Sequence, residues 1–203
     1  MTDDFSKALV ASMEDFGFEI SIDLRERLAA YYNLLLRWND RLHLVAPCSA
    51  EEFALRHVLE SLLLINHLPT GSKVADVGSG AGLPIIPCMI VRPDLVTTLV
   101  ESSQKKSVFL REAMNQLGLK GGKIICKTFE ETPTPEVAFV SCRALDEFVA
   151  KLQVLLKWAP ATSTLLLLGG ANLKEELEMA AADFCETLIP HSTRRFLFVV
   201  KKH

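Results

Sequence analysis

Three glycines at alternate positions, Gly78, Gly80 and Gly82, are the residues of this sequence with the clearest chemical meaning. They follow a strand-like run over residues 73–77 and precede Leu83, so they form a turn between a predicted strand and a predicted helix. Glycine permits positive backbone φ angles and lets a ligand approach the main chain without a Cβ atom in the way. We therefore expect a ligand at this turn, because open α/β sheets bind ligands at the carboxyl ends of their strands.

Two carboxylates indicate which ligand this is. A dinucleotide loop reads G-x-G-x-x-G, whereas the third glycine here comes one residue early. Asp76 would repel a pyrophosphate and suits a cationic ligand such as the aminoacyl part of S-adenosylmethionine. Glu101, at the end of the next predicted strand, would accept hydrogen bonds from both ribose hydroxyls, although dehydrogenases use an acid in the same way. The residues expected to bind the cofactor are Asp76, Gly78, Ser79, Gly80, Gly82, Leu83 and Glu101. The alternatives are a glycine turn without a ligand and a carboxylate that only precedes a helix.

Strands and helices alternate in the part of the chain that carries these residues. The pattern predicts strands over 73–77, 97–101, 123–127, 136–141 and 163–168, and helices over 83–91, 104–118, 145–156 and 173–182. Alternation of this kind implies parallel βαβ units with helices on both faces of the sheet. Two further strand-like runs, 184–189 and 196–201, have no helix between them and should form an antiparallel hairpin.

The residues before 71 are predicted to be helical. Apolar residues recur at helical spacing from Leu24 to Trp38, and Ser49 with Glu52 forms a capping box for a helix that continues to Leu62. We therefore expect an α/β fold with an N-terminal helical extension over 1–70. Residues 71–203 would form one compact Rossmann-like unit, a mostly parallel seven-stranded sheet that ends in an antiparallel hairpin.

Composition narrows the class of protein further. The chain has 203 residues, is 49% hydrophobic and has a net charge of −3, whereas proteins that coat nucleic acid are usually basic. No apolar run approaches the roughly 18 residues of a membrane span, and the acidic N-terminus is unlike an export signal. Five cysteines without a C-x-x-C pair indicate reduced thiols. We expect a cytoplasmic monomer without a metal or a membrane partner, with local basic clusters such as Lys105 and Lys106 that can bind phosphate.

Several motifs, the glycine turn among them, point to one family. They are Leu36-Arg37-Trp38-Asn39, Arg56-His57-Val58-Leu59-Glu60-Ser61, the run from Asp76 to Pro84, Lys105-Lys106 with Phe109-Leu110-Arg111, Phe129-Glu130-Glu131, Cys142-Arg143-Ala144, and Arg195 with Leu197 and Lys201. With these motifs the sequence resembles, over nearly its whole length, the RsmG (GidB) family of bacterial methyltransferases. The resemblance implies a class I S-adenosylmethionine-dependent methyltransferase fold, and transfer of a methyl group to guanine N7 of small-subunit (16S) ribosomal RNA. The implied cofactor is S-adenosylmethionine, and the implied partner is ribosomal RNA or the small ribosomal subunit.

The resemblance also implies roles for individual residues. Phe129 and Glu130 match positions beside the adenosine, and Arg143 matches an arginine that lies by both the cofactor and the reaction site. Arg143 is therefore the expected catalytic residue; it would orient the base or a phosphate through its forked donors, and the alternative is a surface or helix-capping arginine. Guanine N7 carries a lone pair and no proton, so positioning without a general base suffices. The residues expected to contact RNA are Arg56, His57, Lys105, Lys106 and Arg195.

Two residues of the Arg-His motif allow a second interpretation. His57 and Glu60 are three residues apart on a predicted helix and share a face, so they could ligate a metal. No second such pair is visible in the sequence, and a role in the core or in a polar network is the favoured interpretation. For Arg56 two roles are equally consistent with the sequence, a contact with phosphate and a contact that packs its helix.

The sequence departs from the family pattern on the side expected to face RNA. His43 lies in a segment that usually reads Tyr-Asn-Leu-Thr, Glu60 replaces an aspartate, and Gly169 stands where the family has a lysine. Leu145 replaces a phenylalanine, and Glu101 is longer than the usual aspartate. These changes leave two alternatives, a methyltransferase with a changed substrate and a nonenzymatic RNA-binding or ribosome-assembly protein that keeps the cofactor pocket.

Overall fold

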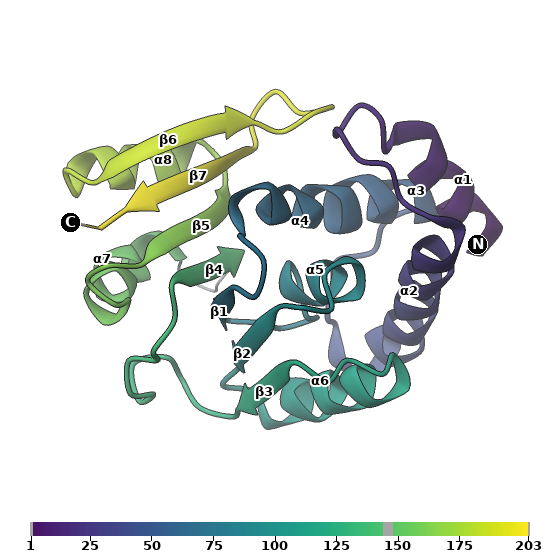
Figure 1. Ribbon diagram of the computed structural model, residues 1–203, viewed down its shortest axis with the longest axis horizontal. Helices are drawn as coiled ribbons and strands as arrows, with labels where there is room; N and C mark the ends of the chain where they lie inside the picture. The colour runs from purple at the N-terminus through teal and green to yellow at the C-terminus, as the bar shows by residue number, and fades with distance from the viewer. Residues whose placement is uncertain (1, 144–147, 203) are drawn as a thin grey trace.

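The structure, a computed structural model, describes residues 2–143 and 148–202 and is built around one sheet. The strands are β1 (Lys73–Val77), β2 (Val96–Val100), β3 (Gly122–Ile125), β4 (Phe139–Arg143), β5 (Thr164–Gly169), β6 (Asp183–Leu188) and β7 (Phe196–Lys201). Their order is β3-β2-β1-β4-β5-β7-β6, as Figure 1 shows. Strands β1 to β5 are parallel, and β7 pairs antiparallel with both β5 and β6. The predicted seven-stranded sheet with a terminal hairpin is confirmed.

The order of the strands places a ligand crevice between β1 and β4. The chain runs outward from β1 to β3 and then crosses back to β4 on the other side of β1. At such a reversal the connections leave the sheet in opposite directions, and a crevice opens outside the carboxyl ends of the strands. The glycine turn follows β1, and Arg143 is the last residue of β4.

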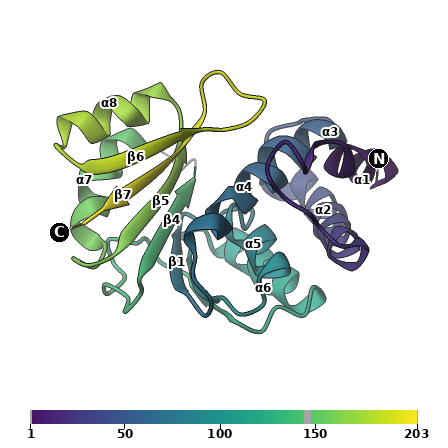
Figure 2. The same ribbon diagram turned by 45° about the horizontal axis from the view of Figure 1, so that its top comes forward.

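Helices cover both faces of the sheet, as Figure 2 shows. Helices α5 (Ile85–Val91) and α6 (Gln104–Gln116) lie on one face, and α7 (Phe148–Trp158) and α8 (Ala171–Met179) lie on the other. Side chains of β5 alternate between the two layers, since Leu166 belongs to one buried cluster and Leu165 and Leu167 to the other. Because both faces are buried, β5 reads as an uninterrupted apolar run.

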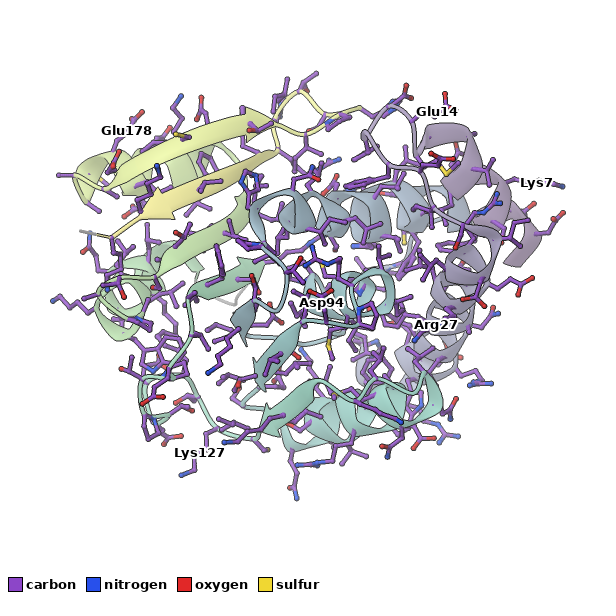
Figure 3. The ribbon with its side chains drawn as sticks, viewed as in Figure 1. Lys7, Glu14, Arg27, Asp94, Lys127 and Glu178 are labelled. Carbon is purple, nitrogen blue, oxygen red and sulfur yellow. The ribbon has the colours of Figure 1, made fainter. Side chains whose placement is uncertain are left out.

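The N-terminal segments pack on the α5 and α6 side and share its core. They begin with α1 (Thr2–Ser12) and α2 (Ile22–Leu42). Arg27 of α2, labelled in Figure 3, donates hydrogen bonds to the carbonyl oxygens of Ile90 and Leu117 at 3.3 and 3.1 Å. One continuous buried cluster contains residues of these helices and of the sheet. A boundary at residue 70 remains a prediction.

The third helical segment differs from the continuous helix that the sequence predicted. Ser49 caps its start as expected, because its Oγ accepts a hydrogen bond from the Glu52 N–H at 3.0 Å. After α3 (Ala50–Glu52), however, Phe53–Leu59 forms a π-helix, followed by α4 (Glu60–Leu62) and the 3₁₀ helix Leu63–His67. Single π turns occur frequently at functional sites. This one carries Arg56 and His57.

Elsewhere the predicted elements are present, with ends that differ by a few residues. The predicted helix over 145–156 corresponds to α7, but its predicted start and the departure at Leu145 lie outside the described residues, as does Ala144. No helix in the described ranges combines the length and the apolar character needed to cross a membrane.

Candidate active site

The glycine turn after β1 adopts backbone angles that favour glycine. The φ angles of Gly78, Gly80 and Gly82 are 68°, 52° and 85°, a region that other L-residues enter only with strain. The Gly78 N–H donates to the carbonyl of Val100 at 2.9 Å, which ties the turn to the end of β2. A Cβ atom on Gly82 would lie 2.3 Å from Cδ1 of Ile86, so the third glycine allows α5 to pack closely against the turn.

Glu101 connects the end of β2 to the same turn. Its side chain is buried, with Oε2 accepting the Gly80 N–H at 2.8 Å and Oε1 accepting the Ser103 N–H at 2.7 Å. Each carboxylate oxygen has two lone pairs and can accept a further hydrogen bond. Main-chain donors thus hold Glu101 in position and leave it able to accept from the hydroxyls of a ligand.

A cavity of about 470 Å³ lies over the turn, and we call it the glycine-turn cavity. Its volume is within the range of roughly 300–1,000 Å³ of small-molecule sites. It is lined by Leu44, Val45, Ala46, Arg56, His57, Gly78, Ser79, Gly80, Ala81, Leu83, Glu101, Ser102, Lys106, Arg143 and Lys151. The cavity therefore joins the sheet edge to the segment after α2 and to the π-helix.

Helix α2 positions two parts of this cavity. The hydroxyl of the buried Tyr31 donates to the carbonyl of Ala81 at 2.7 Å and so supports the glycine turn from below. Asn39 exchanges two hydrogen bonds with the main chain of Val45, at 2.9 and 3.1 Å. The loop that places Leu44 and Val45 in the cavity wall begins at His43, which has a φ angle of 47°.

Four charged or polar side chains form a network on the far side of the cavity. Arg143 places Nη2 3.1 Å from Nδ1 of His57 and 3.8 Å from Oε2 of Glu60. Oε1 of the same glutamate accepts from Nε and Nη2 of Arg195 at 2.8 and 2.5 Å. Glu60 thus joins the end of β4 to the start of β7 through two arginines. The polar-network reading of His57 and Glu60 agrees with this geometry.

Burial sets the protonation of this network. Burial, reinforced by the charge of Arg143, lowers the pKa of His57 to about 3, so the imidazole is neutral at physiological pH. Its Nδ1 can then accept a hydrogen bond from the guanidinium of Arg143. Burial raises the pKa of Glu60, and the charges of Arg143 and Arg195 oppose that shift. The two ion pairs therefore favour the ionised carboxylate.

A second cavity, of about 740 Å³, adjoins the first, and we call it the arginine cavity. The two cavities share Arg56 and Arg143. The arginine cavity extends over the end of β5 to the start of α8. Its lining comprises Arg56, Glu60, Arg143, Leu168, Gly169, Gly170, Ala171, Asn172, Leu173, Ile189, Arg194 and Arg195.

Comparison with known proteins identifies the family. The family model of GidB, rRNA small subunit methyltransferase G, matches residues 24–197. This chain belongs to that family. A ribosomal RNA small subunit methyltransferase G from Paracoccus denitrificans is 36% identical over 170 residues, covering 83% of this chain and 88% of the relative. The protein of that name from Dichelobacter nodosus is 34% identical and covers 100% of this chain and 99% of its own length.

Solved structures agree on the fold. A SAM-dependent methyltransferase from Aquifex aeolicus superimposes with a TM-score of 0.59 at 18% identity and covers 74% of this chain and 93% of its own. The crystal structure of M. jannaschii TYW2 in complex with AdoMet gives a TM-score of 0.56 at 12% identity and covers 71% of this chain and 74% of its own. The class I methyltransferase fold expected from the sequence is confirmed.

Most of the residues expected at the cofactor lie together in this GidB-family chain. Gly78, Ser79, Gly80, Leu83, Glu101 and Arg143 line the glycine-turn cavity. Gly82 and Asp76 lie behind its wall. Asp76 is fully buried; its Oδ1 accepts from the Ser141 hydroxyl at 2.7 Å, and its Oδ2 has no hydrogen-bond partner among the described residues. Burial raises the pKa of Asp76 to about 7.

The two residues expected beside the adenosine do not line the cavity either. Phe129 is buried and packs edge-on against Trp158, with ring centroids 5.7 Å apart. Glu130 is exposed and pairs with Lys151 at 3.4 Å. Because Lys151 does line the cavity, Glu130 lies at one remove from it. Direct contact of Phe129 and Glu130 with a cofactor remains a prediction.

The residues expected to contact RNA divide into two groups. Arg56, His57 and Lys106 line the glycine-turn cavity, and Arg195 lines the arginine cavity. Lys105 is exposed and lines neither. Arg56 forms an ion pair with Glu52 one turn earlier, so it has both a helix contact and a place at the cavity.

Several lining residues were not singled out in the sequence. They are Leu44, Val45, Ala46, Ala81, Ser102 and Lys151. The departure from the family pattern around His43 was the one sign that the segment after α2 belongs to the site. Lys151 comes from α7 and carries no motif that could have marked it.

Proposed function

We propose that this chain transfers the methyl group of S-adenosylmethionine to guanine N7 in small-subunit ribosomal RNA, as its relatives' names and the resemblance suggest. The observation that carries the proposal is the position of Arg143. It lies on the wall shared by the glycine-turn cavity and the arginine cavity. A residue in that position can contact both a cofactor over the glycine turn and a base that enters from the other side.

The glycine-turn cavity fits S-adenosylmethionine by its donor set. Gly78 and Gly80 present bare main chain, and Glu101 offers lone pairs suited to ribose hydroxyls. When bound, the cofactor supplies an electrophilic methyl group. Asp76 does not line this cavity, and burial raises its pKa to about 7. A cationic ligand nearby would favour the ionised form of Asp76, so we assign it a supporting electrostatic role.

The chain's own residues would contribute positioning and exclusion of water. Guanine N7 offers its lone pair directly, so no side chain needs to remove a proton. Arg143, held by His57 and Glu60, would orient the base through planar donors. Leu44 and Val45 would keep water from the reacting atoms. Alignment of this kind can lower a barrier by up to roughly 7–11 kcal/mol.

The partner and its environment follow from the same proposal. Ribosomal RNA or the small subunit would meet the face that carries Arg56, Lys106 and Arg195. A role on ribosomal RNA places the protein in the cytoplasm. We further propose that it acts as a monomer without a metal ion.

Labelled methyl transfer to small subunits from a strain that lacks the modification tests the proposal. We expect one labelled site, a guanine methylated at N7, when the modified base is mapped. Transfer to another base or to a small molecule would support a changed substrate. Binding of both S-adenosylhomocysteine and the subunit without any transfer would support the nonenzymatic assembly protein.

A further inference from the structure

We infer that the arginine cavity holds the target nucleotide, with its base beside Arg143 and a phosphodiester group at Arg194 and the start of α8. This inference rests on the proposed function and deepens it. It assigns a separate site to the RNA component of the reaction. The two cavities would then hold the two substrates on either side of one shared arginine.

The location of the cavity supports this assignment. It adjoins the glycine-turn cavity and shares Arg56 and Arg143 with it. A base must lie next to the methyl donor, and Arg143 is the last residue of β4 at the crevice between β1 and β4. The Nη1 atom of Arg143 is buried and has no hydrogen-bond partner in the described part of the chain. That donor is available to a polar group that enters the cavity.

The charge of the cavity favours a phosphodiester. Four arginines and one carboxylate line it. The carboxylate of Glu60 already accepts two hydrogen bonds from Arg195 and lies 3.8 Å from Arg143. Arg194 is exposed and forms no ion pair with the described residues. A net positive cavity with one uncommitted guanidinium suits an RNA phosphate.

The floor of the cavity leaves main-chain donors open to an anion. Gly170 is the N-cap of α8 and has no side chain to cap the helix, whose first turn contains no acidic residue. The first N–H groups of a helix attract anions when no side chain occupies them. A Cβ atom on Gly169 would lie 2.5 Å from Cδ2 of Leu173, so this part of the floor is closely packed and bare.

The remaining wall suits a base. Leu168, Leu173 and Ile189 supply apolar surface. Splayed RNA bases stack on apolar side chains and on guanidinium planes, and Arg56 and Arg143 line both cavities. The cavity thus combines an apolar wall for a base with cationic groups for its phosphate.

Two substitutions of the same size at Gly170 test the charge requirement. Gly170→Asp and Gly170→Asn both add a side chain that can cap α8, and only the aspartate adds a negative charge to the cavity. We expect Gly170→Asp to raise the KM for undermethylated small subunits at least about tenfold more than Gly170→Asn does, because a phosphate would meet a like charge. S-adenosylhomocysteine affinity, measured by calorimetry, should not differ between the two variants. Equal KM values for the two variants would overturn the assignment.

A third substitution tests the phosphate contact itself. Arg194→Gln should reduce the slope of log affinity against log salt concentration by roughly 0.7, the value for one lost phosphate contact to a single strand. Lys123→Gln, an exposed lysine on β3 at the opposite edge of the sheet, is the control and should leave slope and activity unchanged. An unchanged slope in Arg194→Gln would count against the site. Absence of transfer by the wild-type protein would instead refute the proposed function, so the two failures are distinguishable.

Discussion

The two cavities that meet at Arg143 are built in different ways. Main-chain groups dominate the glycine-turn cavity, where N–H donors hold Glu101 and glycines remove side chains from the ligand's path. The arginine cavity depends on two long side chains from distant segments, Arg143 and Arg195, which converge on Glu60 of a third segment. A short contiguous motif can specify the first arrangement, whereas only folding can assemble the second. Their responses to substitution should differ accordingly.

The largest expected effect is loss of cofactor binding when a side chain blocks the glycine turn. A matched control distinguishes this block from backbone strain. Gly78→Arg should abolish detectable S-adenosylhomocysteine binding in calorimetry, an expected loss of at least about 10³-fold, because a side chain would fill the cavity at a positive φ. Gly118→Arg is a matched control, because Gly118 has a φ angle of 64° and open space around its Cβ position. Both variants bear similar backbone strain, and only the control should bind. Retained binding in Gly78→Arg would remove the turn from the cofactor site.

Arg143, which lines both cavities, should affect turnover more than the binding of either substrate. Arg143→Ala should lower kcat about 10²-fold, since misplaced reactants lose alignment, while S-adenosylhomocysteine affinity changes much less. Arg143→Lys should recover only part of the loss, because an ammonium group lacks the planar fork that also reaches His57 and Glu60. Single-turnover transfer to undermethylated subunits measures the effect. A fully active Arg143→Ala variant would leave the methyltransferase in place and exclude Arg143 from the reaction.

The arginine cavity should lose stability when the one carboxylate in its lining, Glu60, loses its charge. Glu60→Gln should lower the free energy of unfolding by about 2 kcal/mol, less than for a fully buried pair because the Arg195 side chain is 33% exposed. Glu60→Asp, which keeps the charge, should lose less. Urea denaturation of both variants, with Arg195→Met and the double mutant, measures the coupling between Glu60 and Arg195. Additive losses in that cycle would show that the pair is energetically independent.

The glycine-turn side should also show a pH-dependent stability. Asp76 keeps its proton in the folded protein up to about pH 7, whereas the unfolded chain loses it near an ordinary pKa of about 3.9. Stability should therefore fall as pH rises from about 4 to 7, by about 1 kcal/mol per pH unit, and level off above that window. Asp76→Asn should lack this component of the slope in denaturation curves recorded across the range. An identical pH dependence in the variant would place the titration elsewhere.

The local pattern of the sequence predicted much of the fold. Strand β1 has the predicted bounds, and the hairpin of β6 and β7 follows from two strand-like runs without a helix between them. The π-helix was not predictable in this way. Its apolar residues fit an ordinary helical period, and the wider turn becomes visible only in the hydrogen bond from the Glu60 N–H to the carbonyl of Leu55.

The candidate site likewise contains residues that local sequence could identify and residues whose surroundings only the structure shows. The glycine turn and Glu101 could be found from sequence because three glycines and an acid at fixed spacing act through neighbouring main chain. Asp76 belongs to the same run, yet its burial behind the turn depends on Ser141 of β4, which is 65 residues away. Spacing alone could not distinguish a carboxylate in the cavity from one beneath it.

What the sequence determined by itself is the order of elements, the glycine turn and the family, because each depends on residues close together in the chain. The tertiary structure decided which distant side chains share a site. Arg143 and His57, 86 residues apart, come within 3.1 Å, and Glu60 and Arg195, 135 residues apart, form a partly buried ion pair. These contacts exist because the end of β4 and the start of β7 lie near the π-helix and α4 in the folded chain. Such long-range proximity follows from the packing of the whole chain and from no local pattern.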